Sequence, residues 1–249
     1  SMRLISARSR VRISPGPLYY STCHDHSGRL IVMKRFIIGI DEVGRGSWAG
    51  PLFFGAVCFM KTVRIPHGVI IRDSKALSRA QRERSSYFLR KNTTFVIERV
   101  PSETVDRIGL QRATVHGLLT IIRKIRRIIM ASLPALDAEE IQLHYKIDGN
   151  RICDIHEIHE FIVRGDSKIR EISAASIVAK VARDRLLMRL SKVYPEYGFD
   201  SHVGYGTKKH QLALEQHGIC AIHRTSYAPI RRIIMENRVM HRDDELVML

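Results

Sequence analysis

Residues 36–59 read FIIGIDEVGRGSWAGPLFFGAVCF, two apolar runs separated by a polar, glycine-rich segment. The first run ends in the adjacent carboxylates Asp41 and Glu42, and the second begins at Leu52. Short apolar runs bounded by turn residues predict two strands joined by a turn. Because two acids at the end of a hydrophobic strand repel each other and resist desolvation, the pattern favours a bound cation. The alternative is that the acids only end a strand and that Arg45 pairs with one of them.

The residues after the acid pair, Gly44, Arg45 and Gly46, have the composition of a ligand-contacting turn. Glycine lacks a Cβ atom, so the backbone can approach a ligand closely. A guanidinium between two glycines is suited to binding an anion such as phosphate. The local pattern therefore predicts a metal ion beside an anion.

The charge balance of the chain points to a polyanionic partner. Among 249 residues, 41 are Lys or Arg and 25 are Asp or Glu, which gives a formal net charge of +16. Such a charge attracts polyanions and makes association with them fast and sensitive to salt. Nucleic acid is the predicted partner class, the alternative being that the charge serves only solubility. No apolar stretch approaches the roughly 20 residues of a membrane span, so no membrane association is expected, and we expect a monomer.

The cysteines indicate neither a zinc site nor a disulfide framework, because they are scattered and form no CxxC pair. A reducing compartment, by default the bacterial cytoplasm, is the expected location. The four residues are Cys23, Cys58, Cys153 and Cys220.

Residues 1–35 are basic and contain a single acid, Asp25, and no sustained periodicity. We interpret them as a flexible basic extension. Their composition fits an organelle transit peptide, a tail that grips nucleic acid, or residues upstream of a start at Met33. The pair His24 and His26 around Asp25 could bind a metal, but a polar, glycine-flanked segment favours solvated side chains.

The rest of the chain alternates between strand-like and helix-like patterns, which predicts one α/β domain with a mixed central sheet. A helix with Ser78 as its N-cap is expected, and apolar residues at helical spacing predict further helices. The expected strands are 36–40, 52–59, 94–100, 141–147 and 161–163, and the expected helices are 80–92, 104–131, 172–193, one that follows the 201–210 loop and runs through Gln216, and 231–240.

Two further acids follow predicted strands, Asp148 after 141–147 and Asp166 after 161–163. Sites in α/β sheets assemble where strand ends converge, so we expect these acids to join Asp41 and Glu42. Four carboxylates without a histidine or cysteine partner are suited to a hard divalent cation, Mg²⁺ or Mn²⁺. Two such ions roughly 3.5–4 Å apart could activate water and stabilise the leaving oxygen during attack on a phosphodiester.

Tyr205 lies between Gly204 and Gly206 and close to Lys208, Lys209 and His210. An aromatic ring among cationic side chains is suited to stacking on a sugar or base beside phosphate contacts. The alternative is a tyrosine that packs only against its own loop.

Linked motifs occur in one order between about Phe36 and Ile230: GIDEVGRGxxAGP, the DSKxLS turn, IDGN, GDSKxxxISAASIVAKVxRD, and GYGTKxH followed by HRxSYAP. Together they resemble the bacterial-type ribonuclease HII family of type 2 ribonucleases H. The resemblance implies an RNase H-like fold, with a mixed central sheet flanked by helices and a C-terminal helical extension. It places a catalytic domain at 36–230, after the 1–35 extension and before a C-terminal helix and tail at 231–249.

The resemblance also implies an endoribonuclease that cleaves the RNA strand of RNA–DNA hybrids and nicks duplex DNA 5′ of single ribonucleotides. The metal-binding acids of the family fall on Asp41, Glu42, Asp148 and Asp166, and the implied cofactors are two Mg²⁺ or Mn²⁺ ions. With all four acids directed at metals, metal-bound water is the expected nucleophile, and the products would carry 3′-hydroxyl and 5′-phosphate ends.

The substrate contacts implied by the resemblance come from the GRG element, which reads the 2′-hydroxyl and the junction phosphate, and from a tyrosine that stacks on the deoxyribose 3′ of the ribonucleotide. Two lysines near the phosphate track are added as substrate contacts. These roles fall on Gly44, Arg45, Gly46, Tyr205, Lys75 and Lys180.

Asp184 is a further acid that could be mistaken for a metal ligand. Lys180 lies four residues before it, so pairing on a helix surface explains it, and a supporting role is expected. Ser47 and Trp48 stand where the family usually has Pro-Leu, so the backbone after Arg45 is a point to examine.

Two rival functions stay open. A non-enzymatic nucleic-acid-binding module would use the basic faces and Tyr205 and would need no metal. Another nuclease or strand-transfer enzyme of the same fold would use the acids without demanding a ribose, and Arg45 between its glycines argues against it.

Overall fold

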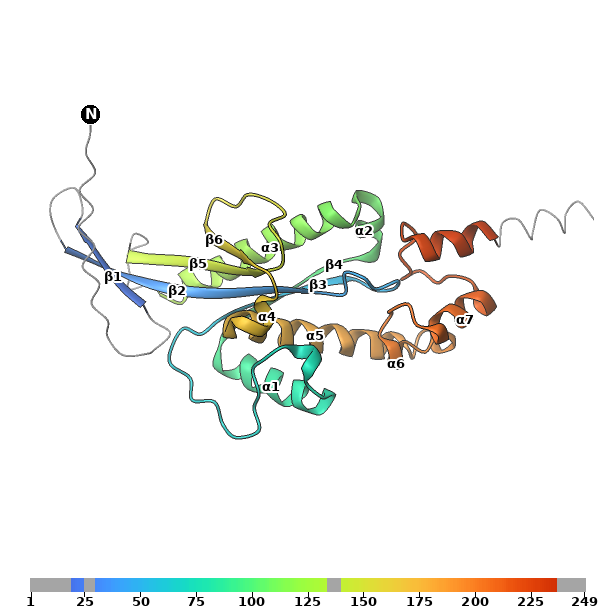
Figure 1. Cartoon of the computed structure of the whole chain (residues 1–249), viewed down its shortest axis with the longest axis horizontal. Coiled ribbons are helices and arrows are strands. Elements are labelled where there is room, and N and C mark those ends of the chain that lie inside the picture. Colours follow the sequence, from blue (N-terminus) through green and yellow to red (C-terminus); the bar gives the residue numbers. More distant parts are fainter. Residues whose placement is uncertain (1–18, 25–29, 134–139, 237–249) are drawn as a thin grey trace, which may run out of the picture.

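The computed structural model describes residues 19–24, 30–133 and 140–236 and shows one mixed sheet between two layers of helices (Figure 1). The order of the strands is β4-β3-β2-β5-β6, and β1 pairs with the first part of β2. Strand β3 runs antiparallel to β2 and β4, whereas β5 and β6 run parallel to β2. The strands are β1 (Tyr19–His24), β2 (Leu30–Val43), β3 (Leu52–Cys58), β4 (Thr94–Val100), β5 (Ile141–Asp148) and β6 (Ile158–Ile162).

One face of the sheet is covered by α2 and α3 and the other by α1 and α5 (Figure 1). The last part of the described chain forms short helices beyond the C-terminal end of α5. The helices are α1 (Arg79–Asn92), α2 (Ser102–Ile108), α3 (Leu110–Ala131), α4 (Gly165–Lys168), α5 (Arg170–Leu190), α6 (Phe199–His202), α7 (Lys208–His217) and a final helix over 228–236. The expected α/β class with a mixed sheet is confirmed.

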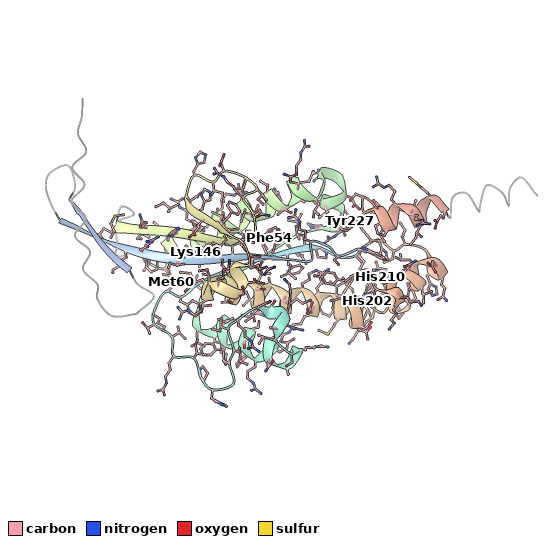
Figure 2. All side chains as sticks on the ribbon, in the orientation of Figure 1. Phe54, Met60, Lys146, His202, His210 and Tyr227 are labelled. Atoms are coloured by element: carbon pink, nitrogen blue, oxygen red, sulfur yellow. The ribbon has the colours of Figure 1, made fainter. Side chains whose placement is uncertain are left out.

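The alternation of side chains along the strands explains the two layers. Ile38 and Ile40 of β2 belong to a buried cluster with Leu118 and Ile121 of α3. Phe54 of β3 joins the same cluster and lies near the middle of the molecule (Figure 2). Because successive strand residues point to opposite faces, the residues between them face α5 instead.

On that second face, α5 approaches the sheet so closely that only glycine fits at two points. A Cβ added to Gly39 would lie 2.0 Å from the backbone of Glu171, and one added to Gly55 would lie 2.3 Å from the carbonyl oxygen of Ala175. Buried Ala174 and Ala175 complete this contact. The helix backbone therefore lies directly on β2, which carries the first acid pair, and on the neighbouring strand β3.

Replacing Gly55 by alanine should lower the free energy of unfolding by about 1–3 kcal/mol, because a methyl group there forces α5 away from the sheet. The matched control is Gly46→Ala, whose added Cβ would meet no heavy atom within 4 Å. Urea unfolding followed by circular dichroism measures both. Equal stability of the two variants would show that α5 can move without cost.

Two sequence predictions of local structure are wrong. The expected helix over 104–131 is two helices, α2 and α3, because Gly109 between them adopts a left-handed φ of 81°. Residues 19–24 and 30–35 form strands β1 and β2, although 1–35 was expected to lack regular structure. Residues 1–18, Asp25, His26 and 237–249 lie outside the described residues, and the domain boundaries stay a prediction.

A second buried cluster joins the end of α5 to the C-terminal helices. It contains Leu187 of α5, Phe199 of α6, Leu214 of α7 and Ile230 of the final helix. Ala49, which follows the GRG element, is buried in the same cluster. The C-terminal helices thus pack against the loop that follows the first acid pair. Among the described helices, none combines the length and apolar character needed to cross a membrane.

Candidate active site

Three parallel strands bring the predicted acids to one edge of the sheet. Asp41 and Glu42 are in the last three residues of β2, and Asp148 ends the neighbouring strand β5. The register pairs Ile40 of β2 with Ile147 of β5. Asp41 and Asp148, the next residue on each strand, are therefore neighbours. Asp166 differs from the prediction, because it lies in the first turn of α4 and not at the end of β6. The convergence of Asp41, Asp148 and Asp166 is as expected.

Burial and mutual repulsion govern the charge state of these acids. Asp41 is 6% exposed, and burial, together with the charges of Asp148 and Asp166, raises its pKa to about 7, against a hydrogen bond from Ser176. Burial and Asp148 also raise the pKa of Asp166. Carboxylates that disfavour one another's charged form are suited to sharing a cation.

Backbone donors and nearby side chains hold the acids in place. The N–H of Glu42 donates to Asp41 Oδ1 at 2.8 Å, and the N–H of Gly165 donates to Asp148 Oδ1 at 2.6 Å. Lys75 Nζ lies 3.8 Å from Asp166 Oδ2. Since the Lys75 side chain is largely exposed, it borders the acids from the solvent side, consistent with its predicted place near the substrate.

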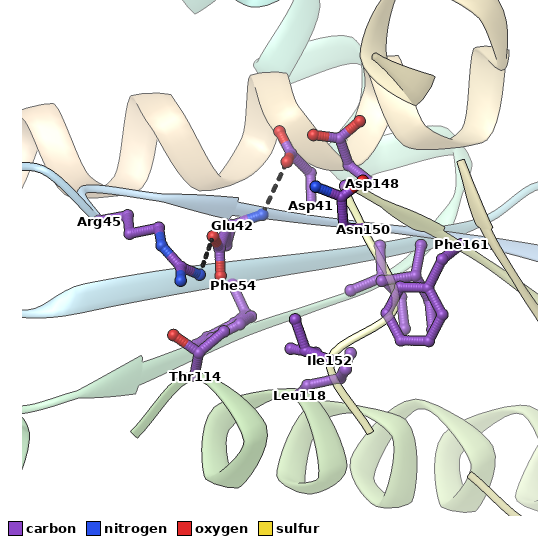
Figure 3. A pocket seen from close by; sticks show the side chains of 13 residues that line it. Asp41, Glu42, Arg45, Phe54, Thr114, Leu118, Asp148, Asn150, Ile152 and Phe161 are labelled. Carbon is purple, nitrogen blue, oxygen red and sulfur yellow. Dashed lines mark hydrogen bonds and ion pairs between the residues drawn. The ribbon is translucent and has the colours of Figure 1, made fainter. Parts of the chain in front are cut away.

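Glu42 faces the other side of the sheet from its neighbour. Figure 3 shows Asp41 and Asp148 pointing towards α5, whereas Glu42 lies with Arg45 towards α3. Glu42 accepts a hydrogen bond from Arg45 Nη1 at 3.0 Å, so the ion pair that the sequence left open is present. Both line a cavity of about 320 Å³, together with Thr114 of α3. Asp41 and Glu42 therefore lie on opposite faces of the sheet at the same edge.

The donor chemistry of the site fits a hard divalent cation, since all four predicted ligands are carboxylates. Within the described ranges, no three histidine, cysteine, aspartate or glutamate side chains are arranged as a closed metal-binding group. Because like charges repel, a cation between these carboxylates would offset their mutual repulsion. The residues that could hold it are Asp41, Glu42, Asp148 and Asp166.

The GRG element is shaped by a buried arginine from α5. Gly44 has a left-handed φ of 91°, and a Cβ there would lie 2.3 Å from Arg183 Nε. Arg183 donates to Ser47 Oγ at 2.5 Å, to the Ala49 carbonyl at 3.1 Å and to the Val203 carbonyl at 2.9 Å. This single guanidinium therefore ties the loop after Arg45 to the loop before Tyr205.

The two predicted substrate-reading loops lie side by side. Ser47 and Tyr205 form an isolated β-bridge, and the N–H of Trp48 donates to the Gly204 carbonyl at 2.8 Å. A Cβ at Gly206 would lie 2.1 Å from the Trp48 ring. Ser47 and Trp48, which depart from the family pattern, therefore form the contact between the GRG element and the tyrosine loop.

The remaining predicted residues, Lys180 and Asp184, form the expected pair on α5. Lys180 Nζ donates to Asp184 Oδ1 at 2.8 Å and lies 5.5 Å from the centre of the Tyr205 ring. The pairing predicted for Asp184 is confirmed. The proximity of Lys180 to Tyr205 places a cation beside the ring predicted to stack on the substrate.

Comparison with known proteins gives the family. Residues 38–230 match the family model described as Ribonuclease HII. The chain belongs to the ribonuclease HII family. A ribonuclease HII from Pelagibacter ubique is 34% identical over 201 residues, which cover 80% of this chain and all of the relative. The chain is therefore an enzyme of the ribonuclease H class, a phosphodiester-hydrolysing endonuclease, and not a non-enzymatic binding module.

Solved structures agree with the RNase H-like fold. The ribonuclease H2 of Pyrococcus horikoshii has a TM-score of 0.60 at 22% identity, with 82% of this chain and 99% of that chain covered. Bst-RNase HIII in complex with Mn²⁺ has a TM-score of 0.55 at 15% identity, with 80% and 69% covered. At these identities the likeness concerns the fold, and the predicted fold class is confirmed.

Some residues that shape this ribonuclease HII site were not found from the sequence. Arg183 and Arg224 are fully buried arginines that donate to loop carbonyls, and Tyr227 donates to the Arg45 carbonyl. Ser176 of α5 was not singled out either, yet its hydroxyl lowers the pKa of Asp41. No local signal marks Arg183 as buried, because most of its partners are carbonyl oxygens distant in the sequence.

Proposed function

We propose that the chain hydrolyses the RNA strand of RNA–DNA hybrids and nicks duplex DNA 5′ of single ribonucleotides, leaving 3′-hydroxyl and 5′-phosphate ends. The observation that carries the proposal is the pairing of the loop after Arg45 with the loop of Tyr205, beside Asp41 and Asp148. A nuclease that ignored the sugar would not need both loops at this edge.

In this proposal, Arg45 and its flanking glycines read the ribonucleotide. The Arg45 side chain is about half exposed, and the Gly46 position is open to solvent. The exposed backbone can approach a ribose, whose 2′-hydroxyl distinguishes RNA from DNA. The Arg45 guanidinium, which pairs with Glu42 here, is the natural partner for a phosphate.

In this proposal, Tyr205 contacts the sugar that follows the ribonucleotide. Its ring is partly buried and lies near two cations, Lys180 and Arg183, at 5.5 and 5.3 Å. Lys180 is suited to a flanking phosphate, as is exposed Lys75 at the other side of the acids, whereas Arg183 is fully buried and holds the loops. The substrate would thus lie across the edge of the sheet, with its phosphate over the carboxylates.

Asp41, Glu42, Asp148 and Asp166 would hold the divalent ions, two Mg²⁺ or Mn²⁺ in our proposal. Such ions supply an activated water and charge stabilisation at the leaving oxygen. The chain itself orients the phosphodiester through Arg45, Tyr205 and the lysines.

The proposal predicts a metal-dependent nick at one position. A 5′-labelled DNA duplex with a single ribonucleotide, incubated with the protein and Mg²⁺ or Mn²⁺, should give one product that ends immediately 5′ of the ribonucleotide. A uniform RNA–DNA hybrid should be cut at several positions. Gel electrophoresis resolves both products, and samples with EDTA are the metal-free controls. Cleavage of an all-DNA duplex at a similar rate would refute the assignment of Arg45 and Tyr205 to ribose recognition.

A further inference from the structure

Three histidines, His202, His210 and His223, form a buried histidine cluster beyond the end of α5. Their exposed fractions are 8%, 0% and 2%. The rings of His202 and His210 are stacked at 4.5 Å, and Nε2 of His210 lies 3.0 Å from Nε2 of His223. Figure 2 shows His202 and His210 at the end of the molecule that holds the C-terminal helices, where Phe199 packs against all three rings. The ribonuclease reaction described above uses none of them.

Backbone partners determine which ring nitrogens carry protons in two members of the cluster. His210 Nδ1 lies 3.0 Å from the Tyr205 carbonyl, which can only accept, so Nδ1 bears the proton. His223 Nδ1 lies 2.8 Å from the backbone nitrogen of Cys220, whose N–H can only donate, and farther, at 3.2 Å, from the Cys220 carbonyl oxygen, so the shorter contact assigns Nδ1 as an acceptor. His223 Nε2–H therefore donates to His210 Nε2, and both rings are neutral.

The protonated nitrogen of the His202 ring is assigned in the same way. His202 Nε2 lies 2.7 Å from the Tyr197 carbonyl and so donates to it. His202 Nδ1 accepts from the N–H of Gly204 at 3.3 Å. Each ring carries one proton. A second proton would have to bind the other ring nitrogen, which already accepts a hydrogen bond, and would point at that donor. Burial lowers the pKa of His210 and of His223 to about 4, so these neutral forms are the ones present at neutral pH.

The cluster holds the tyrosine loop from both sides. Gly204, before Tyr205, donates to His202, and the Tyr205 carbonyl accepts from His210. The residue before Gly204, Val203, has a left-handed φ of 44°, and a β-branched residue keeps such a conformation only where surrounding contacts hold it. His223 anchors the cluster to the segment that follows α7, where it forms a β-bridge with Ala49.

Among the described residues, no charged side chain forms a hydrogen bond with the three rings. Lys209 and Asp200 act on His202 with opposite sign, and Glu196 acts on Cys220 next to His223. In the described part of the chain, each ring bonds only to backbone groups, to another ring or to the Cys220 sulfur. The position of the loop thus depends on a neutral hydrogen-bond chain.

We infer that His210 and His202 are positioning residues for substrate recognition, which hold Tyr205 in place through the hydrogen bonds to its loop. The inference rests on the proposed function, because it needs Tyr205 to contact the substrate. It assigns the histidine cluster to binding of the ribonucleotide junction and not to the hydrolytic step. Loss of the bond to Tyr205 should weaken binding while the acids continue to act.

The test is a double-mutant cycle between positions 210 and 205, read as KM and kcat on a duplex with one ribonucleotide. His210→Phe keeps the aromatic packing with Trp48 and Phe199 but loses the bond to Tyr205. It should raise KM about tenfold and leave kcat within about threefold. His210→Asn places an amide N–H where Nδ1 lies and should restore KM to within about threefold. In a Tyr205→Ala background, His210→Phe should have no further effect.

The outcomes for the Tyr205 and His210 variants distinguish a failure of the histidine inference from a failure of the proposed function. If Tyr205→Ala alone leaves KM and kcat unchanged, the role given to Tyr205 in the proposed function is wrong. If Tyr205→Ala raises KM but His210→Phe does not, or if the two effects multiply, only the histidine inference is overturned. A loss of kcat at unchanged KM in His210→Phe overturns it too. Should His210→Phe not fold by circular dichroism, the comparison of His202→Leu with His202→Asn, which retains an acceptor for Gly204, carries the same test.

Discussion

Asp41→Asn should abolish cleavage and at the same time stabilise the cation-free protein. For activity, the variant loses a buried carboxylate that interacts with the charges of both Asp148 and Asp166. Removing a charged ligand from a phosphoryl-hydrolysing centre should lower kcat by at least roughly a thousandfold, or about 4 kcal/mol in activation free energy. Product gels on the single-ribonucleotide duplex measure this loss.

The stability gain follows from the raised pKa of Asp41, about 7 in the folded protein against roughly 3.9 in an unfolded chain. The folded state binds the proton more tightly, so the stability linked to Asp41 is complete below about pH 4 and is lost as pH rises to about 7. The three-unit difference corresponds to about 4 kcal/mol lost by the wild type at pH 8. Asparagine never ionises, so the variant keeps that stability.

Urea unfolding in EDTA at pH 8 and pH 5.5 measures this effect. The free energy of unfolding of Asp41→Asn should exceed that of the wild type by up to about 4 kcal/mol at pH 8, and by about half as much at pH 5.5. Asp184→Asn is the matched control, because its carboxylate is paired with Lys180 and the variant should show no gain. A variant less stable than the wild type at pH 8 would mean that burial does not penalise the Asp41 charge.

The acid site was predictable because its chemistry is local in the sequence. Apolar runs that end in carboxylates identified Asp41 and Asp148, and parallel strands bring such ends together whatever the details of packing. Strand alternation also explains why Glu42 points to the opposite face of the sheet from Asp41, although all four acids were expected to bind metal together. Asp166 was placed correctly in the constellation but on the wrong element, because Arg164 adopts a left-handed φ of 56° that starts α4 early.

The strand character of 30–35 was missed for a different reason. Lys34 and Arg35 interrupt the apolar run at Leu30–Met33, so the strand appeared to begin at Phe36. In the structure, residues 34 and 35 pair with both β1 and β5. Pairing partners that are distant in sequence decide such a boundary, and hydrophobic periodicity cannot reveal them.

The contacts that shape the substrate loops were unpredictable from local pattern. A buried arginine whose partners are carbonyls leaves no opposite charge in the sequence to reveal it. Arg183 bonds to residues more than 130 positions away, and Arg224 to the carbonyls of Gly50 and Arg45. Only the fold shows that these loops share one scaffold.

Arg183→Met should be strongly destabilising and should disturb substrate binding. Arg183 is fully buried, and burial lowers its pKa to about 10, so it stays charged at neutral pH. Methionine of similar length removes the cost of the buried charge but leaves the carbonyls of Pro51 and Val203 without this donor. Each unsatisfied buried carbonyl costs about 1–3 kcal/mol, so we expect a net loss of about 2–4 kcal/mol in the free energy of unfolding.

The effect on function should exceed the effect of lost stability alone. Arg183 joins the loop after Arg45 to the loop before Tyr205, so its loss should raise KM for the single-ribonucleotide duplex at least tenfold under conditions where the variant is folded. Arg185→Met, two residues along α5 on an exposed ion pair with Glu83, is the control and should stay within about 0.5 kcal/mol and twofold in KM.

Arg183→Lys separates the charge from the geometry of the guanidinium. Lysine has one nitrogen where arginine reaches Ser47, Ala49, Val203 and Pro51 from three, and the same burial would lower the pKa of its amine towards neutrality. We therefore expect Arg183→Lys to be at least as damaging as Arg183→Met. Chemical denaturation and KM on the same duplex measure both. Full recovery in the lysine variant would show that the two loops need a positive charge between them and not the multiple hydrogen bonds of arginine.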